Sequence, residues 1–196
     1  MRRRVLSLTV AAGAAFLVLI GLGTWQLQRR EWKEGLIAAR DVALAAAPVE
    51  LPTSADAARD LEFHRVRVTG TYLYDRTIFV HAIERAHGDA GYLALTPMRL
   101  ASGGVVLVER GWIPPALRDA TKNVAGNPAG EVALEGILRL APEGRPGSFV
   151  PDNDPARGEW YYIDLATMAR AAGVPEALPF YVEAGSAPNP GGYPVG

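Results

Sequence analysis

The sequence contains no cysteine, and it has only three histidines, His64, His81 and His87. The absence of cysteine excludes disulfides, thiolate metal sites and a cysteine nucleophile, and it leaves the redox compartment open. The histidines form no close pair with metal-ligand spacing such as H-x-x-x-H. The formal net charge of −1 gives no electrostatic basis for binding nucleic acid.

The common catalytic motifs are also missing. The sequence has no G-x-S-x-G nucleophile elbow and no glycine-rich phosphate loop with its lysine. A catalytic triad would need the fold to bring together three distant residues, Ser148, His64 and Asp152. A membrane-anchored periplasmic hydrolase that uses such a triad is therefore an alternative function. Asp152, Asp154 and Glu159 lie in a polar loop without the twelve-residue pattern of a calcium-binding EF-hand. Solvated carboxylates are the simpler interpretation there.

One long apolar run stands near the start of the chain. A basic tail, residues 1–4, precedes the run from Val5 to Gly23. About 20 apolar residues at about 1.5 Å per residue span the roughly 30 Å hydrocarbon layer of a bilayer. We therefore expect a retained transmembrane helix over residues 5–27. A cleavable signal peptide is the alternative, but the run is too long for one and no small-x-small site follows it.

The residues that follow the run suit a membrane interface. Trp25 and Trp32 can place their indole rings among headgroups, and Arg29 can extend toward phosphates. Together with Gln26 they are candidate partner contacts, although they can equally serve only to fix the helix end. Basic residues on both sides of the span do not orient it. The length of the downstream segment favours a basic tail inside and the domain outside.

A second helical segment and a soluble domain are expected after the span. Residues 28–47 are rich in good helix formers, and Pro48 closes the segment, which predicts a juxtamembrane stalk helix. Residues 48–196 are numerous enough for one domain with a real core.

The domain is dominated by short stretches with strand character. In several of these stretches, polar and apolar residues alternate, as half-buried strands require. The expected strands are 64–74, 77–83, 92–100, 105–112, 131–140, 159–163 and 180–183. The segment 102–104 (Ser-Gly-Gly) predicts a hairpin turn, and Gly136 inside a strand indicates a bulge or a close backbone approach.

Little helix is expected in the domain. Asp164 is placed to cap a helix that runs to residue 171, and 115–122 is expected to include a short helical turn. The predicted fold class is α+β, mainly antiparallel β (a small barrel or a sandwich), with an N-terminal transmembrane helix and one or two short helices. The long loops 121–130 and 141–158 are expected to be functional or partner-facing.

The most distinctive local pattern is Arg110-Gly111-Trp112. Gly111 interrupts a strand, and the prolines at 114 and 115 forbid its continuation. We expect Arg110 and Trp112 on the same side of the strand. Arginine and tryptophan are typical of interaction hot spots, so the three residues are candidate partner contacts. The alternative is that the arginine stacks on the tryptophan and seals the end of a barrel.

Motifs in a fixed order along nearly the whole chain resemble the SURF1 family (Shy1 in yeast), which are assembly factors for cytochrome c oxidase. The strand at 106–114 resembles the family's pattern closely, with Glu109 where asparagine is commoner. The motifs are Gly23-x-Trp25-Gln26-x-x-Arg29-x-x-Trp32-Lys33, Val66-x-Val68-x-Gly70-x-Tyr72, Gly91-Tyr92-x-x-x-Thr96-Pro97, Val106 to Pro114, Gly136-x-Leu138-Arg139, Phe149-x-Pro151-x-Asn153, Trp160-Tyr161-x-Ile163-Asp164, Phe180-Tyr181-Val182 and Gly191-Gly192-Tyr193-Pro194.

The resemblance implies a membrane-anchored factor, not an enzyme, that assists insertion of haem a into the catalytic subunit of the oxidase. The implied partners are the oxidase subunits (above all catalytic subunit I), haem a synthase and membrane lipid. The implied location is the cell inner membrane with the soluble domain on the periplasmic side. A protein-binding scaffold that never binds haem is the alternative within the family.

The resemblance also implies a second membrane helix, because the family normally has two such helices with the soluble domain between them. This chain stops at Gly196, before that helix would begin. Bacterial members of the family have been associated with haem a, so haem a is a possible cofactor. The candidate ligands in this chain are His64, His81 and His87, and a ligand from a second helix is the alternative.

Overall fold

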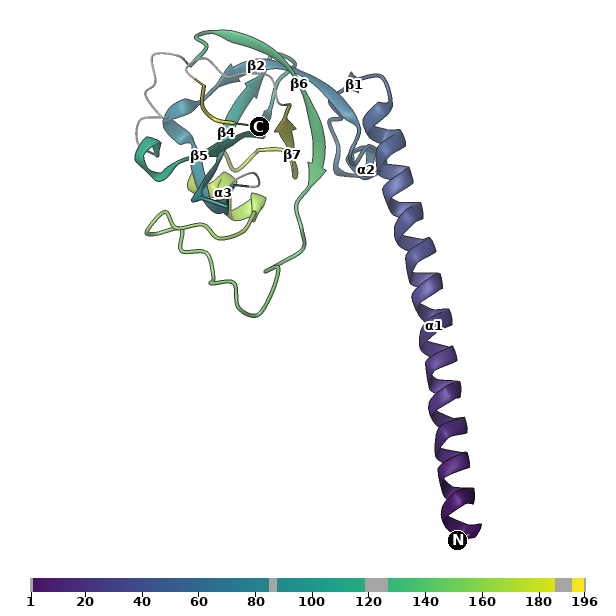
Figure 1. Ribbon diagram of the computed structural model, residues 1–196. Coiled ribbons are helices and arrows are strands. Elements are labelled where there is room, and N and C mark those ends of the chain that lie inside the picture. The colour runs from purple at the N-terminus through teal and green to yellow at the C-terminus, as the bar shows by residue number, and fades with distance from the viewer. Residues whose placement is uncertain (1, 85–87, 119–126, 186–191, 196) are drawn as a thin grey trace. The chain divides into compact units, whose positions relative to one another are not determined.

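The computed structural model describes residues 2–84, 88–118, 127–185 and 192–195 (Figure 1). The chain divides into two compact units, Met1–Val42 and Ala43–Gly196. The first unit is helical, and the second is built around one β-sheet.

Helix α1 (Arg2–Ala45) is continuous over both segments that the sequence analysis separates, residues 5–27 and 28–47. It contains no proline, and the described side chains from residue 2 to residue 42 are exposed. The hydroxyl of Thr24 donates to the carbonyl oxygens of Ile20 and Gly21, 3.1 and 2.9 Å away. The helix is long and apolar enough to cross a membrane.

Seven strands form one mostly antiparallel sheet, so the prediction of an α+β fold that is mainly antiparallel β is confirmed. The strands pair in the order β1-β2-β6-β7-β5-β4-β3, with parallel pairing in β1–β2 and β5–β7. The elements are β1 (Val49–Glu50), α2 (Ala55–Asp60), β2 (Arg65–Tyr72), β3 (Ile78–Ile83), β4 (Ala90–Leu100), β5 (Val105–Ile113), β6 (Glu131–Leu140), α3 (Leu165–Ala171) and β7 (Phe180–Ala184), with single 3₁₀ turns at Tyr74–Arg76 and Pro115–Leu117.

Strand β2 lies near one end of this order and β4 near the other, and an additional pairing joins the two strands directly. This pairing closes five strands into a ring: β2, β6, β7, β5 and β4. Strand β4 pairs with β3 through residues 90–95 and with β2 through residues 98–100. Pro97 lies between these two stretches, where its missing N–H removes no ladder bond to either partner. Gly70 of β2 pairs with Leu100 of β4 and also with Val132 of β6.

Alternate residues of the ring strands build two apolar clusters on opposite faces of the sheet. Val106 and Val108 of β5 join an inner cluster to which all five ring strands contribute. Val105 and Leu107 of the same strand join an outer cluster, which α3 covers with Leu165, Met168 and Ala169. The period-two alternation therefore buries both faces of β5.

Several local predictions are confirmed. The hairpin turn lies at 102–104, with positive φ angles of 95° and 87° at Gly103 and Gly104. Asp164 caps α3, because its carboxylate accepts from the Thr167 N–H at 3.1 Å. A Cβ at Gly136 would lie 2.6 Å from the carbonyl oxygen of Glu183, which confirms the close approach.

The predicted strand at 159–163 is wrong. Glu159 and Trp160 form only isolated bridges, and the chain bends after them. The side-chain oxygen of Asn153 accepts from the N–H groups of Tyr161 and Tyr162 at 2.8 and 3.3 Å, so these donors are not available to a ladder. The sequence analysis also missed β1 and α2. Residues 119–122 of the expected turn at 115–122 lie outside the described residues.

We expect Gly70→Ala to lower the free energy of unfolding by about 1–3 kcal/mol or more, because the new methyl group would clash with the carbonyl oxygen of Arg99. Urea unfolding of the detergent-solubilised full chain measures this. Gly147→Ala is the matched control, since its methyl group would meet nothing within 4 Å. Equal stability of the two variants would show that the β2–β4 closure tolerates the extra volume.

Candidate functional site

Arg110 of β5 is a buried cation enclosed mainly by aromatic rings. The residue is only 2% exposed. Its guanidinium carbon lies 5.1 Å from the ring centre of Tyr72 and 5.0 Å from that of Tyr74. The Nη2 group donates to the side-chain oxygen of Asn127 at 3.2 Å. Two ring faces and one amide oxygen therefore surround the charge.

The electrostatics of this cluster are unfavourable for a cation. In the described part of the chain, Nε and Nη1 of Arg110 have no hydrogen-bond partner. Burial lowers the pKa of Arg110 and raises the pKa of Tyr72 to about 12, the latter against the opposing effect of the arginine charge. Burial likewise raises the pKa of Tyr74. Both tyrosines stay neutral at ordinary pH, so neither supplies a counter-ion.

Trp112 lies in different surroundings, so the interpretation of Arg110 stacked on Trp112 is wrong. The pairing of β4 with β5 shifts register between Leu93 and Leu95, and Gly111 has a φ of 119°. This irregularity interrupts the alternation that would place Arg110 and Trp112 on one side. Trp112 pairs with Val195 through two backbone hydrogen bonds of 2.7 and 2.9 Å. It also lines a pocket of about 260 Å³.

Gly91 makes room for the indole of Trp112. A Cβ at Gly91 would lie 2.5 Å from the ring carbons Cε2 and Cζ2. The indole Nε1 is buried, and the described residues give it no acceptor. Among the described residues, three buried donor nitrogens of the Arg110-Gly111-Trp112 motif therefore have no hydrogen-bond partner: Nε and Nη1 of Arg110 and Nε1 of Trp112.

His81 of β3 belongs to a separate polar and aromatic cluster. Its Nε2 lies 2.6 Å from Oε2 of Glu159, and its ring stacks on Tyr161 with centroids 4.8 Å apart. The ring of Tyr92 lies at the same centroid distance, tilted by 49°. Arg118 lies 4.9 Å from the Tyr92 ring centre and 3.5 Å from Oε1 of Glu159. The cluster ties the loop at 154–160 to β3.

The carboxylate of Glu159 is stabilised by its neighbours. The hydrogen bond with His81 lowers the pKa of Glu159, with smaller contributions from the charges of Arg118 and His81. Burial opposes this shift only in part.

Each described histidine has an oxygen atom close to one of its two ring nitrogens. An axial histidine needs a free ring nitrogen that points into a cavity. At His81, Glu159 occupies Nε2 and aromatic rings lie against the imidazole, although the residue lines a pocket of about 510 Å³. Nδ1 of His64 lies 3.4 Å from the carbonyl oxygen of Glu62. His87 lies outside the described residues.

The carboxylates of the polar loop have local partners. Asp152 faces Arg145 at 3.3 Å, and Asp154 accepts from the Arg157 N–H at 3.2 Å. Among the described residues, no group of three or more histidine, aspartate or glutamate side chains is arranged to hold a metal ion.

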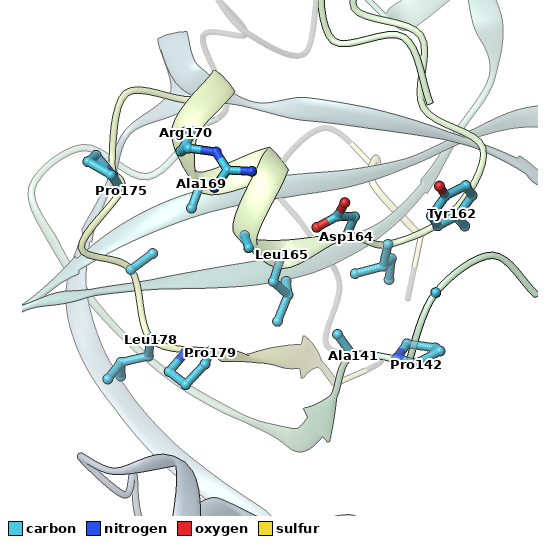
Figure 2. Close-up of a pocket in the computed structure, with 14 residues that line it drawn as sticks. Ala141, Pro142, Tyr162, Asp164, Leu165, Ala169, Arg170, Pro175, Leu178 and Pro179 are labelled. Carbon is cyan, nitrogen blue, oxygen red and sulfur yellow. The ribbon is translucent and has the colours of Figure 1, made fainter. Parts of the chain in front are cut away.

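A groove lies beside α3 (Figure 2). Its volume is about 590 Å³, and it runs between α3, the segment that follows β6 and the segment before β7. Leu165 and Ala169 face it from the helix, with Pro142 and Leu178 on other walls. The sequence analysis did not identify this groove, because its walls come from three separate segments.

The candidate contacts in the first unit lie on α1 and are exposed. Trp25 and Trp32 are 50% and 59% exposed. The guanidinium of Arg29 lies 5.6 Å from the ring centre of Trp25. Gln26 is exposed on the same helix.

These features define a class of protein: a helix of membrane-spanning length followed by one β-rich unit that carries a buried, ring-enclosed arginine. The model of the SURF1 family matches residues 13–195. The chain belongs to the SURF1 family.

Individual relatives agree with this assignment. The SURF1-like protein of Monosiga brevicollis is 40% identical over 191 residues, which are 92% of this chain and 71% of that protein. Surfeit locus protein 1 of Homo sapiens is 36% identical over 191 residues, which are 90% of this chain and 62% of that protein. The mouse protein of that name is 36% identical, over 92% of this chain and 64% of its own length. The chain thus spans roughly two thirds of these relatives.

We expect Arg110→Met to leave the free energy of unfolding unchanged or to raise it, because an apolar side chain of similar length removes a poorly compensated buried charge and still packs between the two tyrosines. Urea unfolding of the full chain in detergent measures this. Leu107→Ala on the same strand should cost about 2–5 kcal/mol and shows that the assay detects core losses. A loss above about 3 kcal/mol in Arg110→Met would instead mark the arginine as structural.

We expect Glu159→Gln to flatten the dependence of stability on pH in the acid range. The pKa of Glu159 is lower in the fold than its ordinary value of 4.5. Its contribution is therefore fully present above about pH 4.5 and is lost as the pH falls through the lowered pKa. Unfolding of the full chain as a function of pH measures the slope. The exposed Glu176→Gln is the control, and identical slopes for both variants would contradict the prediction.

Proposed function

We propose that this chain is a membrane-anchored assembly factor for cytochrome c oxidase and not an enzyme. The observation that carries the proposal is the match to the SURF1 family over residues 13–195, which includes most of α1 and nearly all of the β-rich unit.

In this proposal α1 holds the protein in the membrane and the β-rich unit contacts oxidase components beside it. Residues 1–4 form the basic tail, 5–27 the membrane span and 28–47 the stalk, with residues 48–196 on the periplasmic side of the inner membrane. The proposed partner contacts nearest the lipid are four residues of α1: Trp25, Gln26, Arg29 and Trp32. The partners are catalytic subunit I of the oxidase and haem a synthase.

Arg110, Gly111 and Trp112 are the proposed contacts in the β-rich unit. In the described part of the chain, the Nε and Nη1 groups of the buried Arg110 guanidinium have no hydrogen-bond partner, which supports a role in binding. The positive φ of Gly111 lets the strand change direction between the two side chains.

We further propose that the protein assists haem a insertion by holding the catalytic subunit, without carrying haem on its described histidines. The observation behind this choice is the engagement of His81 Nε2 by Glu159 at 2.6 Å. Carriage of haem a by this chain, or with a ligand from a second helix after residue 196, is the competing function.

The first test is oxidase assembly in cells that lack this chain. The full chain should restore the haem a absorbance of the oxidase and should co-purify with subunit I. Arg110→Met should be produced at the normal level but restore oxidase at least about tenfold less well, because the contact is lost and the fold is not. Arg170→Met, an exposed arginine on α3, is the control. Failure of the wild-type chain to restore any oxidase would overturn the proposal.

The second measurement is the visible spectrum of the full chain purified from cells that make haem a. The docking proposal predicts no Soret band that depends on His64 or His81. A band that disappears in His81→Ala would establish carriage of haem by this chain. A band that appears only after extension of the chain with a second helix would place the ligand beyond residue 196.

A further inference from the structure

Arg110 has one guanidinium edge at which no described residue accepts a hydrogen bond. A guanidinium presents two such edges, Nη2 with Nε and Nη2 with Nη1, and each holds two parallel N–H groups. Nη2 carries two hydrogens, and the side-chain oxygen of Asn127, 3.2 Å away, accepts from this nitrogen. Nε and Nη1 have no partner in the described part of the chain. Whichever edge the Asn127 oxygen occupies, the other edge therefore holds two N–H groups without an acceptor.

The surroundings of Arg110 do not replace the missing acceptor. The ring faces of Tyr72 and Tyr74 attract the charge, but they offer no in-plane oxygen to the N–H groups. The Tyr74 hydroxyl is itself a donor, to the carbonyl oxygen of Pro128 at 3.1 Å. Bulk water does not reach the guanidinium, because Arg110 is only 2% exposed. A buried donor without a partner needs an explanation, and an acceptor that binds from outside the chain supplies one.

The charge of this cluster selects the kind of acceptor. Burial raises the pKa of Tyr72 to about 12 and also raises the pKa of Tyr74, so both side chains stay neutral. The contacts described for Arg110 include no carboxylate. A carboxylate has two oxygens that match two parallel N–H groups, and its single negative charge cancels that of the guanidinium. A dianionic phosphate would leave an excess negative charge in a buried site, and a water molecule would leave the cation without a counter-ion.

Arg110 lies at one end of the strand ring. Strand β2 ends there at Tyr72, β5 ends at Ile113 and β6 begins at Glu131, because β5 runs parallel to β2 and β6 antiparallel to it. Residues 127–128 precede β6 and contact the cluster through two hydrogen bonds, of 3.2 and 3.1 Å. They belong to no strand, so they can be displaced without a change in strand pairing. A partner side chain can therefore approach from this end of the ring.

We propose that Arg110 binds a carboxylate of a partner protein, from an aspartate, a glutamate or a chain terminus, on the guanidinium edge that has no acceptor. Residues 127–128 move aside as the carboxylate enters. Without the partner, the hydrogen bonds from Tyr74 and Arg110 hold these residues in place and keep the site closed. This inference rests on the proposed function, in which Arg110 contacts a partner protein, and it adds the chemistry of that contact.

The first test is a titration of the full chain in detergent with propionate, whose carboxylate end is that of a glutamate side chain. The Nε–H signal of Arg110 in the proton–nitrogen NMR spectrum reports binding, and Arg110→Lys identifies this signal by its absence. Propionate at constant ionic strength should move the signal saturably. Propionamide, which has the same shape without the charge, should not move it, and inorganic phosphate should bind at least about tenfold more weakly. No saturable shift with propionate, or tighter binding of phosphate, would overturn the proposal.

A second variant tests whether residues 127–128 close the site. Tyr74→Phe keeps the aromatic ring beside Arg110 and removes the hydrogen bond to the Pro128 carbonyl oxygen. Propionate should then bind at least about threefold more tightly, because less free energy opposes the displacement. Tyr162→Phe, in the groove beside α3, is the matched control and should bind propionate like the wild-type chain. Equal affinities for all three proteins would contradict the closed state.

The protein source of the carboxylate is tested in membranes that contain the oxidase. Arg110→Lys places an amine at the site, and a carbodiimide condenses an amine with a carboxylate that lies against it, taking up the water that is lost. The proposal predicts an amide link between position 110 and an aspartate, a glutamate or a C-terminus of an oxidase subunit, located by mass spectrometry. Arg110→Gln carries no amine and should give no link. If propionate binds and no link forms, the assignment to a partner protein is overturned in favour of a small-molecule carboxylate.

The proposed function and the carboxylate site fail in different experiments. If the full chain binds propionate but does not restore the oxidase, the proposed function is wrong and the site remains. If the chain restores the oxidase but does not bind propionate, only the inference about the carboxylate is wrong.

Discussion

The β2–β4 pairing is the constraint on which the rest of the β-rich unit depends. It joins the two halves of the strand order and turns an open sheet into a ring with a common interior. The pairing needs a glycine at position 70, because the backbone of β4 passes where a side chain would lie. It also needs β4 to leave β3 and join β2, and Pro97 lies at that change of partner. The inner cluster to which all five ring strands contribute follows from this closure.

The closure also explains the surroundings of Arg110. Tyr72 is the last residue of β2 and pairs with Met98 of β4, whose other neighbour is β5. Strand β2 is thereby held close enough to β5 for the rings of Tyr72 and Tyr74 to enclose the guanidinium. The enclosure leaves two of its nitrogens without partners in the described part of the chain. A cation held in this way bears a desolvation cost that its neighbours offset only in part.

Structural features that depend on residues close together in the sequence were predicted well. The cap at Asp164, the glycine turn at 103–104 and most strands depend on local conformational preference or on period-two alternation. The segment 159–163 failed because Asn153, distant from it by several residues, takes the backbone donors that a strand would use. Helix α2 was missed because its six residues are too few to show the 3.6-residue repeat of apolar positions that predicts a helix. The alternative in which Arg110 stacks on Trp112 failed because the register shift between β4 and β5 cannot be predicted from the alternation of polar and apolar residues.

The sequence by itself determined the long apolar helix, the strand-rich composition of the remaining chain and the family, because these depend on residue types in linear order. Only the tertiary structure decided which strands are neighbours, that the ring closes through β2 and β4, and that Tyr72 and Tyr74 surround Arg110. It also decided that Glu159 engages His81 and that a groove lies beside α3. The physical reason is that pairing, burial and cavity shape arise between residues far apart in the chain, and local preference does not specify them.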